Sequence, residues 1–190
     1  ADSSTSNSGT ANLTTKVGGG TIDIGNSTTG AYSLTGLSGN DTLKGNGNAD
    51  IINGGGGDDN IDGRGGNDEI NAGAGDDIIT VSSAGQGDGD TIDGGSGTDT
   101  LSLSSGSHAF ATDAKLQNIN SITLASTSTV IDLTGQTEGL TITGGAQADT
   151  ITAGSGDDII NGAGGADIIK GAGGIDTISL GSSDSASDII

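Results

Sequence analysis

The residues of this chain that could do chemistry are its carboxylates, and almost all of them are aspartates. The 25 acidic residues comprise 23 Asp and two Glu, against only five Lys and Arg, which gives a formal net charge of −20. A solvated acidic surface would use both acids. Asp is favoured where a short carboxylate folds back onto its own turn or reaches an ion held in a backbone loop. The bias towards Asp therefore indicates metal ligands.

These aspartates belong to a nonapeptide repeat. From Gly36 the chain reads GLSGNDTLK, GNGNADIIN, GGGGDDNID, GRGGNDEIN and AGAGDDIIT, and after four extra residues (Val81–Ala84) it continues with GQGDGDTID and GGSGTDTLS. A second block from Gly144 reads GGAQADTIT, AGSGDDIIN, GAGGADIIK and GAGGIDTIS, followed by a degenerate copy near Ser183–Ile190. The sixth residue of each good copy is a candidate metal ligand: Asp41, Asp50, Asp59, Asp68, Asp77, Asp90, Asp99, Asp149, Asp158, Asp167 and Asp176.

The repeat predicts a turn followed by a very short strand. Glycines permit a tight turn that exposes backbone carbonyls, and the last three residues place one aliphatic side chain inward. Two nonapeptides then form one coil, so Asp41, Asp59 and Asp77 would line one edge, and Asp50 and Asp68 the other. Carboxylates stacked about 4.8 Å apart repel one another unless a cation lies between them. Carbonyl and carboxylate oxygens suit Ca²⁺, whereas Mg²⁺ prefers stricter octahedral geometry and Zn²⁺ prefers His or Cys.

The eleven copies resemble the RTX (repeats-in-toxin) nonapeptide, G-G-x-G-x-D-x-U-x, in which U is a large aliphatic residue. The resemblance implies several bound Ca²⁺ ions, export by a one-step (type I) apparatus and folding outside the cell. Departures lie mostly at the opening glycines, for example at Leu37, Asn46 and Arg64. Gln147 replaces the fourth glycine of Gly144–Thr152, so we expect a weaker site in that copy.

The expected fold is all-β: a parallel β-roll or β-helix solenoid of calcium-bound turns with intervening calcium-free rungs. We divide the chain into an opening segment and rung (1–35), a first calcium block (36–102), a protruding loop with calcium-free rungs (103–143) and a second calcium block (144–190). Within this division, Ala1–Lys16 is expected to be flexible or tied to a neighbour, and Leu103–Lys115 to form the loop.

Counting in nines extends the repeat beyond the two blocks. Backward from Ile178, the inward positions include Ile151, Ile142, Leu133 and Leu124, and the aspartate position is filled by Ile122, Ile131 and Leu140. Tyr32 and Leu34 fit the same two positions before the first block. We therefore expect metal-free rungs in the middle of the chain and at its opening.

Other residues carry simpler interpretations. The fifth-position aspartates Asp58, Asp76 and Asp157 are expected to face solvent, His108 to be an ordinary loop residue, and Arg64 and Lys44 to lie on the surface. No nucleophile–base constellation, zinc-protease motif or phosphate loop is present, so we expect no enzyme activity. The negative charge argues against nucleic acid, and no segment is apolar enough to insert into a membrane.

The leading hypothesis is a calcium-binding structural module of a secreted bacterial cell-surface protein, in a surface layer or extracellular fibre, with self-association into a lattice or fibre. RTX-type surface-layer proteins are similar in their Ser/Thr content and in their lack of Cys and Met. Two alternatives remain open: the repeat region of a large RTX adhesin, or the C-terminal secretion and folding module of an exported RTX enzyme or toxin. The apolar end Ser187–Ile190 is expected to meet another subunit, or to continue into a further rung in a longer chain.

Overall fold

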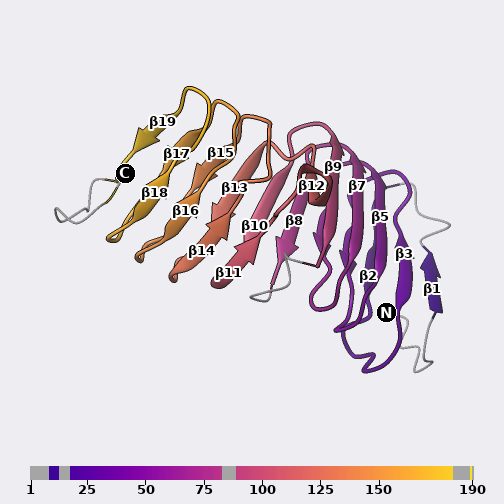
Figure 1. Cartoon of the computed structure of the whole chain (residues 1–190). Coiled ribbons are helices and arrows are strands. Elements are labelled where there is room, and N and C mark those ends of the chain that lie inside the picture. The colour runs from indigo at the N-terminus through magenta and orange to yellow at the C-terminus, as the bar shows by residue number, and fades with distance from the viewer. Residues whose placement is uncertain (1–8, 13–17, 83–88, 182–188, 190) are drawn as a thin grey trace.

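The computed structural model describes residues 9–12, 18–82, 89–181 and 189, and these form a parallel β-solenoid (Figure 1). Every strand pairing among them is parallel. The all-β solenoid predicted from the repeat is therefore confirmed. None of the described residues belongs to a helix long and apolar enough to cross a membrane.

One side of the solenoid is a single nine-stranded sheet that runs the length of the described chain. Its strands, in spatial order from the N-terminal end, are β2 (Thr21–Asp23), β4 (Thr42–Lys44), β6 (Asn60–Asp62), β8 (Ile78–Val81), β10 (Thr100–Leu103), β13 (Ser121–Leu124), β15 (Thr141–Thr143), β17 (Ile159–Asn161) and β19 (Thr177–Ser179).

The other side is divided into two sheets. The six-stranded sheet contains β1 (Gly9–Asn12), β3 (Tyr32–Thr35), β5 (Ile51–Gly56), β7 (Glu69–Ala74), β9 (Thr91–Ser96) and β12 (Leu116–Gln117). The four-stranded sheet contains β11 (Gly106–Ala109), β14 (Thr129–Asp132), β16 (Thr150–Thr152) and β18 (Ile168–Lys170). The 3-10 turn η1 (Asp113–Lys115) immediately precedes β12, so the division falls within one coil.

Two nonapeptides make one coil, as predicted. Ile52 pairs with Ile70 across neighbouring coils, and Ile61 pairs with Ile79. The pairing then steps over the four-residue insertion, because Ile70 pairs with Ile92 and Ile79 with Leu101. Ser83 and Ala84 of that insertion lie outside the described residues, as do residues 1–8 and 13–16 of the N-terminal segment and most of the degenerate copy near Ser183–Ile190.

The core is a narrow stack of inward aliphatic side chains, and Ile61, Ile79 and Ile160 are among those fully shielded from solvent. The opening rung follows the prediction. Leu34 pairs with Ile52 at the inward position, and Tyr32 lies where the later coils have an aspartate. Tyr32 is buried, and its hydroxyl lies 2.8 Å from Ser27 Oγ.

The middle segment continues the solenoid, but the predicted register is wrong by two residues. Ile142 pairs with Ile122 and Ile151 with Ile131, so those two isoleucines are inward core residues and do not occupy the aspartate position. The turn between β14 and β15 is two residues longer than a nonapeptide allows. A register counted backward in nines is therefore displaced by two residues for the strands before this turn. Leu140 does occupy the aspartate position and is buried.

The expected protruding loop, Leu103–Lys115, is largely built into the solenoid. Leu103 belongs to β10, and β11 pairs with β14 so that His108 lies opposite Ile131. His108 and Phe110 are both fully buried, and His108 Nε2 lies 3.0 Å from the Ser104 carbonyl. The interpretation of His108 as a loop residue is therefore wrong: alternation along β11 places His108 inward and Ser107 outward.

Candidate metal centre

The sixth-position aspartates stack along the two edges of the solenoid, where the turns enter the strands. One column, the Asp59 edge, leads into the nine-stranded sheet, and its members in the first block are Asp41, Asp59, Asp77 and Asp99. The opposite column, the Asp68 edge, contains Asp50, Asp68 and Asp90. In the second block Asp158 stacks with Asp176, and Asp149 stacks with Asp167.

These carboxylates point into the protein. Ten of the eleven candidate ligands are buried, and the exception, Asp176, is half-buried. Each Oδ1 accepts the backbone N–H of the residue at the same position one coil earlier. Asp41 N donates to Asp59 Oδ1 at 2.7 Å, and Asp59 N donates to Asp77 Oδ1 at 2.7 Å. Within each block the sixth position thus forms a hydrogen-bonded ladder between coils.

The second carboxylate oxygen explains why nine of the eleven copies begin with glycine. A Cβ added to Gly54 would clash with Asp59 Oδ2, and one added to Gly63 would clash with Asp68 Oδ2. The second and fourth positions have left-handed backbone, as at Gly55 and Gly57, each with φ 105°. Glycine adopts this conformation without the steric cost of a side chain. The turn therefore wraps its backbone closely around its own carboxylate.

Several of these second oxygens have no protein partner. Oδ2 is buried without a hydrogen bond at Asp59, Asp77, Asp99 and Asp158. Leaving a buried charged oxygen unsatisfied is costly, so the arrangement is incomplete as protein alone. A cation placed against these oxygens would satisfy them.

Burial and mutual repulsion raise the pKa of these carboxyls. Desolvation is the largest cause throughout. The pKa rises to about 6 at Asp59 and to about 7 at Asp68, where neighbouring aspartates add to desolvation, and burial alone raises it to about 6 at Asp90. The pKa is also raised at Asp50, Asp77, Asp99, Asp149 and Asp158. Both causes weaken when a cation neutralises the column.

The donor set fits Ca²⁺. This ion takes six to eight oxygens, and two stacked carboxylates supply only part of that number, so backbone carbonyls of the turns must supply the rest. The described residues contain no group of three or more Asp, Glu, His or Cys side chains around one point. The single histidine is in the core with Nε2 beside a carbonyl, which leaves no nitrogen ligand set for Zn²⁺.

The fifth-position aspartates face solvent, as predicted, yet they form a second ladder on the outside of the Asp59 edge. Asp76 N donates to Asp58 Oδ1 at 3.0 Å, and Thr98 N donates to Asp76 Oδ1 at 2.8 Å. Here the acceptor is on the earlier coil, the reverse of the buried ladder. These exposed carboxylates stabilise the turns without pointing at the unsatisfied oxygens.

A role of the ninth position was missed from the sequence. Its Asp or Asn side chain accepts the backbone N–H two residues later, where the next turn becomes left-handed. Examples are Asp62 with Arg64 N at 2.9 Å and Asp93 with Gly95 N at 3.0 Å. The recurring Asx–x–Gly spacing was the available signal, because Asx side chains commonly cap turns in this way.

Between the two blocks the columns lose their carboxylates. Asn120 takes the aspartate position after Asp99 and accepts its N–H at 2.6 Å, and Leu140 follows one coil later. On the other edge Thr129 takes the position before Asp149. The middle coils therefore have hydrogen-bonding or apolar groups in place of stacked charges.

Fold and site together define a calcium-binding β-solenoid. A family model, the RTX calcium-binding nonapeptide repeat, matches in four copies at residues 28–61, 54–83, 84–107 and 141–184. The matches cover more than half of the chain, which therefore belongs to the RTX family, and its repeats bind several calcium ions. No curated protein and no solved structure matches the chain significantly.

Proposed function

We propose that this chain is a structural module of a secreted bacterial cell-surface protein, in a surface layer or extracellular fibre, which folds when external calcium fills its turns. The observation that supports the proposal best is the buried aspartate ladder with unsatisfied oxygens. A chain of net charge −20 with 29% hydrophobic residues needs counter-ions to close these columns. Calcium outside the cell supplies them.

The distribution of functional groups favours a structural role over catalysis. The only histidine, His108, is fully buried and holds the Ser104 carbonyl, so it is not available as a general base on the surface. The described aspartates of the columns are engaged in backbone hydrogen bonds between coils. Their repetition along the molecule suits a scaffold whose length is set by the number of repeats.

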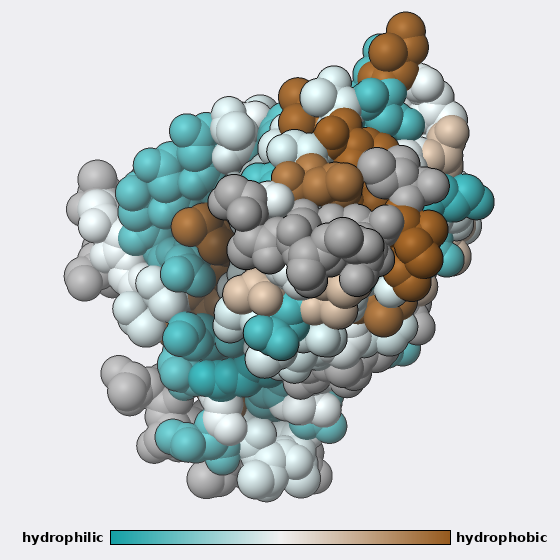
Figure 2. Space-filling model, turned by 90° about the vertical axis from the view of Figure 1, so that its left-hand side faces the viewer, coloured by the Kyte–Doolittle hydropathy of each residue, from teal (hydrophilic) through white to brown (hydrophobic). Residues whose placement is uncertain are grey.

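Self-association into a lattice or fibre is supported by outward aliphatic side chains. Ile51, Ile78, Ile159 and Ile168 stand at outward strand positions and are each about half exposed, and Ile175 is 83% exposed. Figure 2 views the C-terminal end of the solenoid and shows apolar side chains gathered there beside a band of polar ones. We propose that the apolar side chains at this end form a contact region for another molecule.

Light scattering of purified protein tests the assembly. We expect particle size to grow when millimolar calcium is added and to stay low in a variant carrying Ile159→Lys and Ile175→Lys. A control carrying Ser107→Lys and Thr123→Lys, at outward strand positions of β11 and β13, adds the same two charges to polar surface and should still assemble. Protein that stays monomeric in calcium at all concentrations would contradict the proposed assembly, while calcium-induced folding followed by circular dichroism would remain a separate result.

A further inference from the structure

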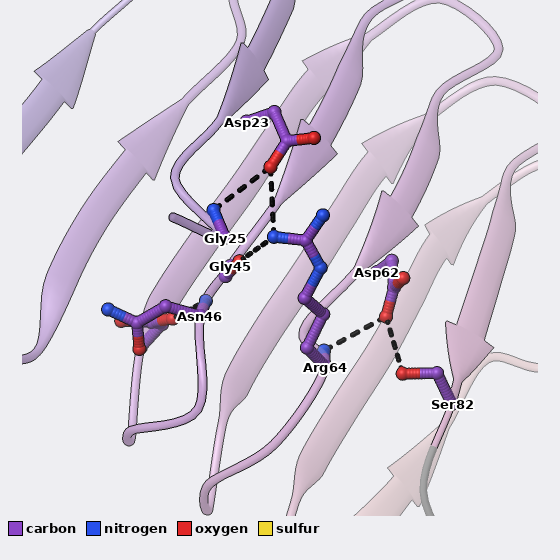
Figure 3. A network of polar contacts seen from close by, with 8 residues as sticks. Asp23, Gly25, Gly45, Asn46, Asp62, Arg64 and Ser82 are labelled. Atoms are coloured by element: carbon purple, nitrogen blue, oxygen red, sulfur yellow. Dashed lines mark hydrogen bonds and ion pairs between the residues drawn. The ribbon is translucent and has the colours of Figure 1, made fainter. Parts of the chain in front are cut away.

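Arg64 reaches across two turns of the Asp68 edge. It stands at the second position of the repeat 63–71, and its Nη1 lies 2.8 Å from Asp23 Oδ1 and donates to the Gly45 carbonyl at 2.7 Å (Figure 3). Gly45 opens the preceding calcium turn, and Asp23 belongs to the coil before that. One guanidinium thus connects the opening, metal-free turn (24–31) to the first calcium turn on this edge (45–50).

The interval between those two turns is closed entirely by protein groups. Asn46 Nδ2 donates to the Gly30 carbonyl at 3.0 Å. Both oxygens of Asp50 are occupied, since Oδ1 accepts Tyr32 N and Oδ2 accepts Asn46 N, each at 2.8 Å. By contrast, the Oδ2 atoms of Asp59 and Asp77 on the Asp59 edge have no hydrogen-bond partner.

Arg64 has this position although the backbone there favours glycine. Its φ is 67°, in the left-handed region, where a side chain carries a steric cost. The same position holds glycine at Gly55 and Gly95, and alanine at Ala163 (φ 66°). A long cationic side chain at such a site calls for a compensating interaction, and the contacts with Asp23 and Gly45 provide one.

The electrostatic environment of Arg64 also indicates that its contact with Asp23 is favourable. The pKa of Asp23 is lowered, first by its hydrogen bond with the Arg64 side chain and then by the Gly25 N–H. Gly25 lies so close to the guanidinium that a Cβ there would clash with it. Asp62, which accepts Arg64 N at 2.9 Å and Ser82 Oγ at 3.1 Å, fixes the turn from which the side chain extends.

We propose that Arg64 is a built-in cation that joins the opening turn to the calcium block in place of a metal ion. The opening coil then stays attached without a calcium ion of its own. The inference concerns the calcium-binding module itself, and it does not depend on the surface-layer or fibre role.

Amide hydrogen exchange of the calcium-loaded protein tests this. The reporters are the Ile24 and Tyr32 amides, which bond to Lys44 O and Asp50 Oδ1 across the interval. Arg64→Gly and Asp23→Asn should each lower their protection by about threefold, the size expected for a partly exposed ion pair. The double variant should lose no more than either single variant. In wild-type protein, 1 M salt should cause the same loss of protection at these two amides, because it screens exposed ion pairs.

Two controls make the test decisive. Ala163→Gly introduces glycine at the same backbone conformation without removing a charge, and the Ile78 amide, bonded to Asp59 O on the other edge, should keep its protection in every variant. Unchanged protection at Ile24 and Tyr32 in Arg64→Gly overturns the proposal, as do additive losses in the double variant. Protection at these two amides that rises with free calcium in folded wild-type protein also overturns it, because a metal ion would then be joining the turns.

Discussion

Asp77 accepts the backbone N–H of Asp59 through Oδ1 at 2.7 Å, while its Oδ2 is buried with no hydrogen-bond partner. One carboxylate therefore performs two tasks. It fixes the spacing between neighbouring coils through a bond that needs no metal, and it holds an oxygen ready for a cation. The same division recurs at Asp59 and Asp99, so we expect calcium to complete the structure of this edge.

Removal of calcium should unfold the protein. Each site contributes roughly 1.4 kcal/mol when free calcium is ten times its Kd, and several sites together exceed what this small core supplies. Far-UV circular dichroism should show disorder in EGTA and β-structure after millimolar Ca²⁺ is restored, but not after the same concentration of Mg²⁺. A β-spectrum that survives thorough chelation would refute this.

Asp59→Asn should raise the calcium midpoint for folding by about tenfold or more, because it removes a charged ligand shared by the turns on either side. The amide oxygen can still accept Asp41 N–H, so the ladder itself is retained. The matched control is Asp58→Asn, which removes the same charge from an exposed neighbour and should change the midpoint by less than about threefold. Equal shifts in the two variants would mean that total charge, and not position, governs binding.

Without calcium, the folded fraction of the protein should rise as the pH falls below about 7. The folded pKa is raised to about 6 at Asp59 and to about 7 at Asp68, above the usual aspartate value near 3.9. In the metal-free fold, the stability gained from protonating them is present at acid pH and is lost as the pH rises through 6 to 7. In calcium-free buffer, far-UV circular dichroism should therefore show more β-structure at about pH 5 than at about pH 8. Equal β-content at the two pH values would contradict the burial of these carboxyls.

Gly54→Ala should destabilise the calcium-loaded protein by about 1–3 kcal/mol, because the new methyl group meets Asp59 Oδ2 and the Ala72 carbonyl. Gly56→Ala is the matched control in the same strand. Its added Cβ would have ordinary contacts of 3.8 Å and 3.9 Å, and the expected change is within about 0.5 kcal/mol. Chemical denaturation at fixed free calcium measures both, and similar losses would show that glycine matters here only for chain entropy.

Phe110→Ala should cost about 3–5 kcal/mol, since this side chain is fully buried in the coil that divides the two shorter sheets. Ser107→Ala, outward on neighbouring β11, should be close to neutral. Thermal unfolding in calcium compares the two variants. If Phe110→Ala had no effect on stability, the result would support the protruding loop that was predicted from the sequence and would contradict a packed coil.

Repeats with an intact nonapeptide could be placed from sequence alone. The two-repeat coil, the stacking of Asp41 with Asp59 and the metal-free Tyr32 rung all follow from a fixed period. The period fails where a turn changes length: two extra residues between β14 and β15 moved Ile122 and Ile131 from the aspartate position to the core. Contacts between residues far apart in the sequence could not be predicted either, because nothing in the sequence around Arg64 indicates that Asp23 is its partner.

The unequal division of the sheets has a mechanical consequence. On one side β10, β13 and β15 pass through the middle coil without a break, while on the other side β12 closes one sheet and β11 opens the next (Figure 1). Among the described strands, an unbroken sheet therefore joins the two calcium blocks along one face only. We expect the rod to bend at this coil. The nine-stranded sheet would act as the hinge, and each calcium block would move as a rigid body.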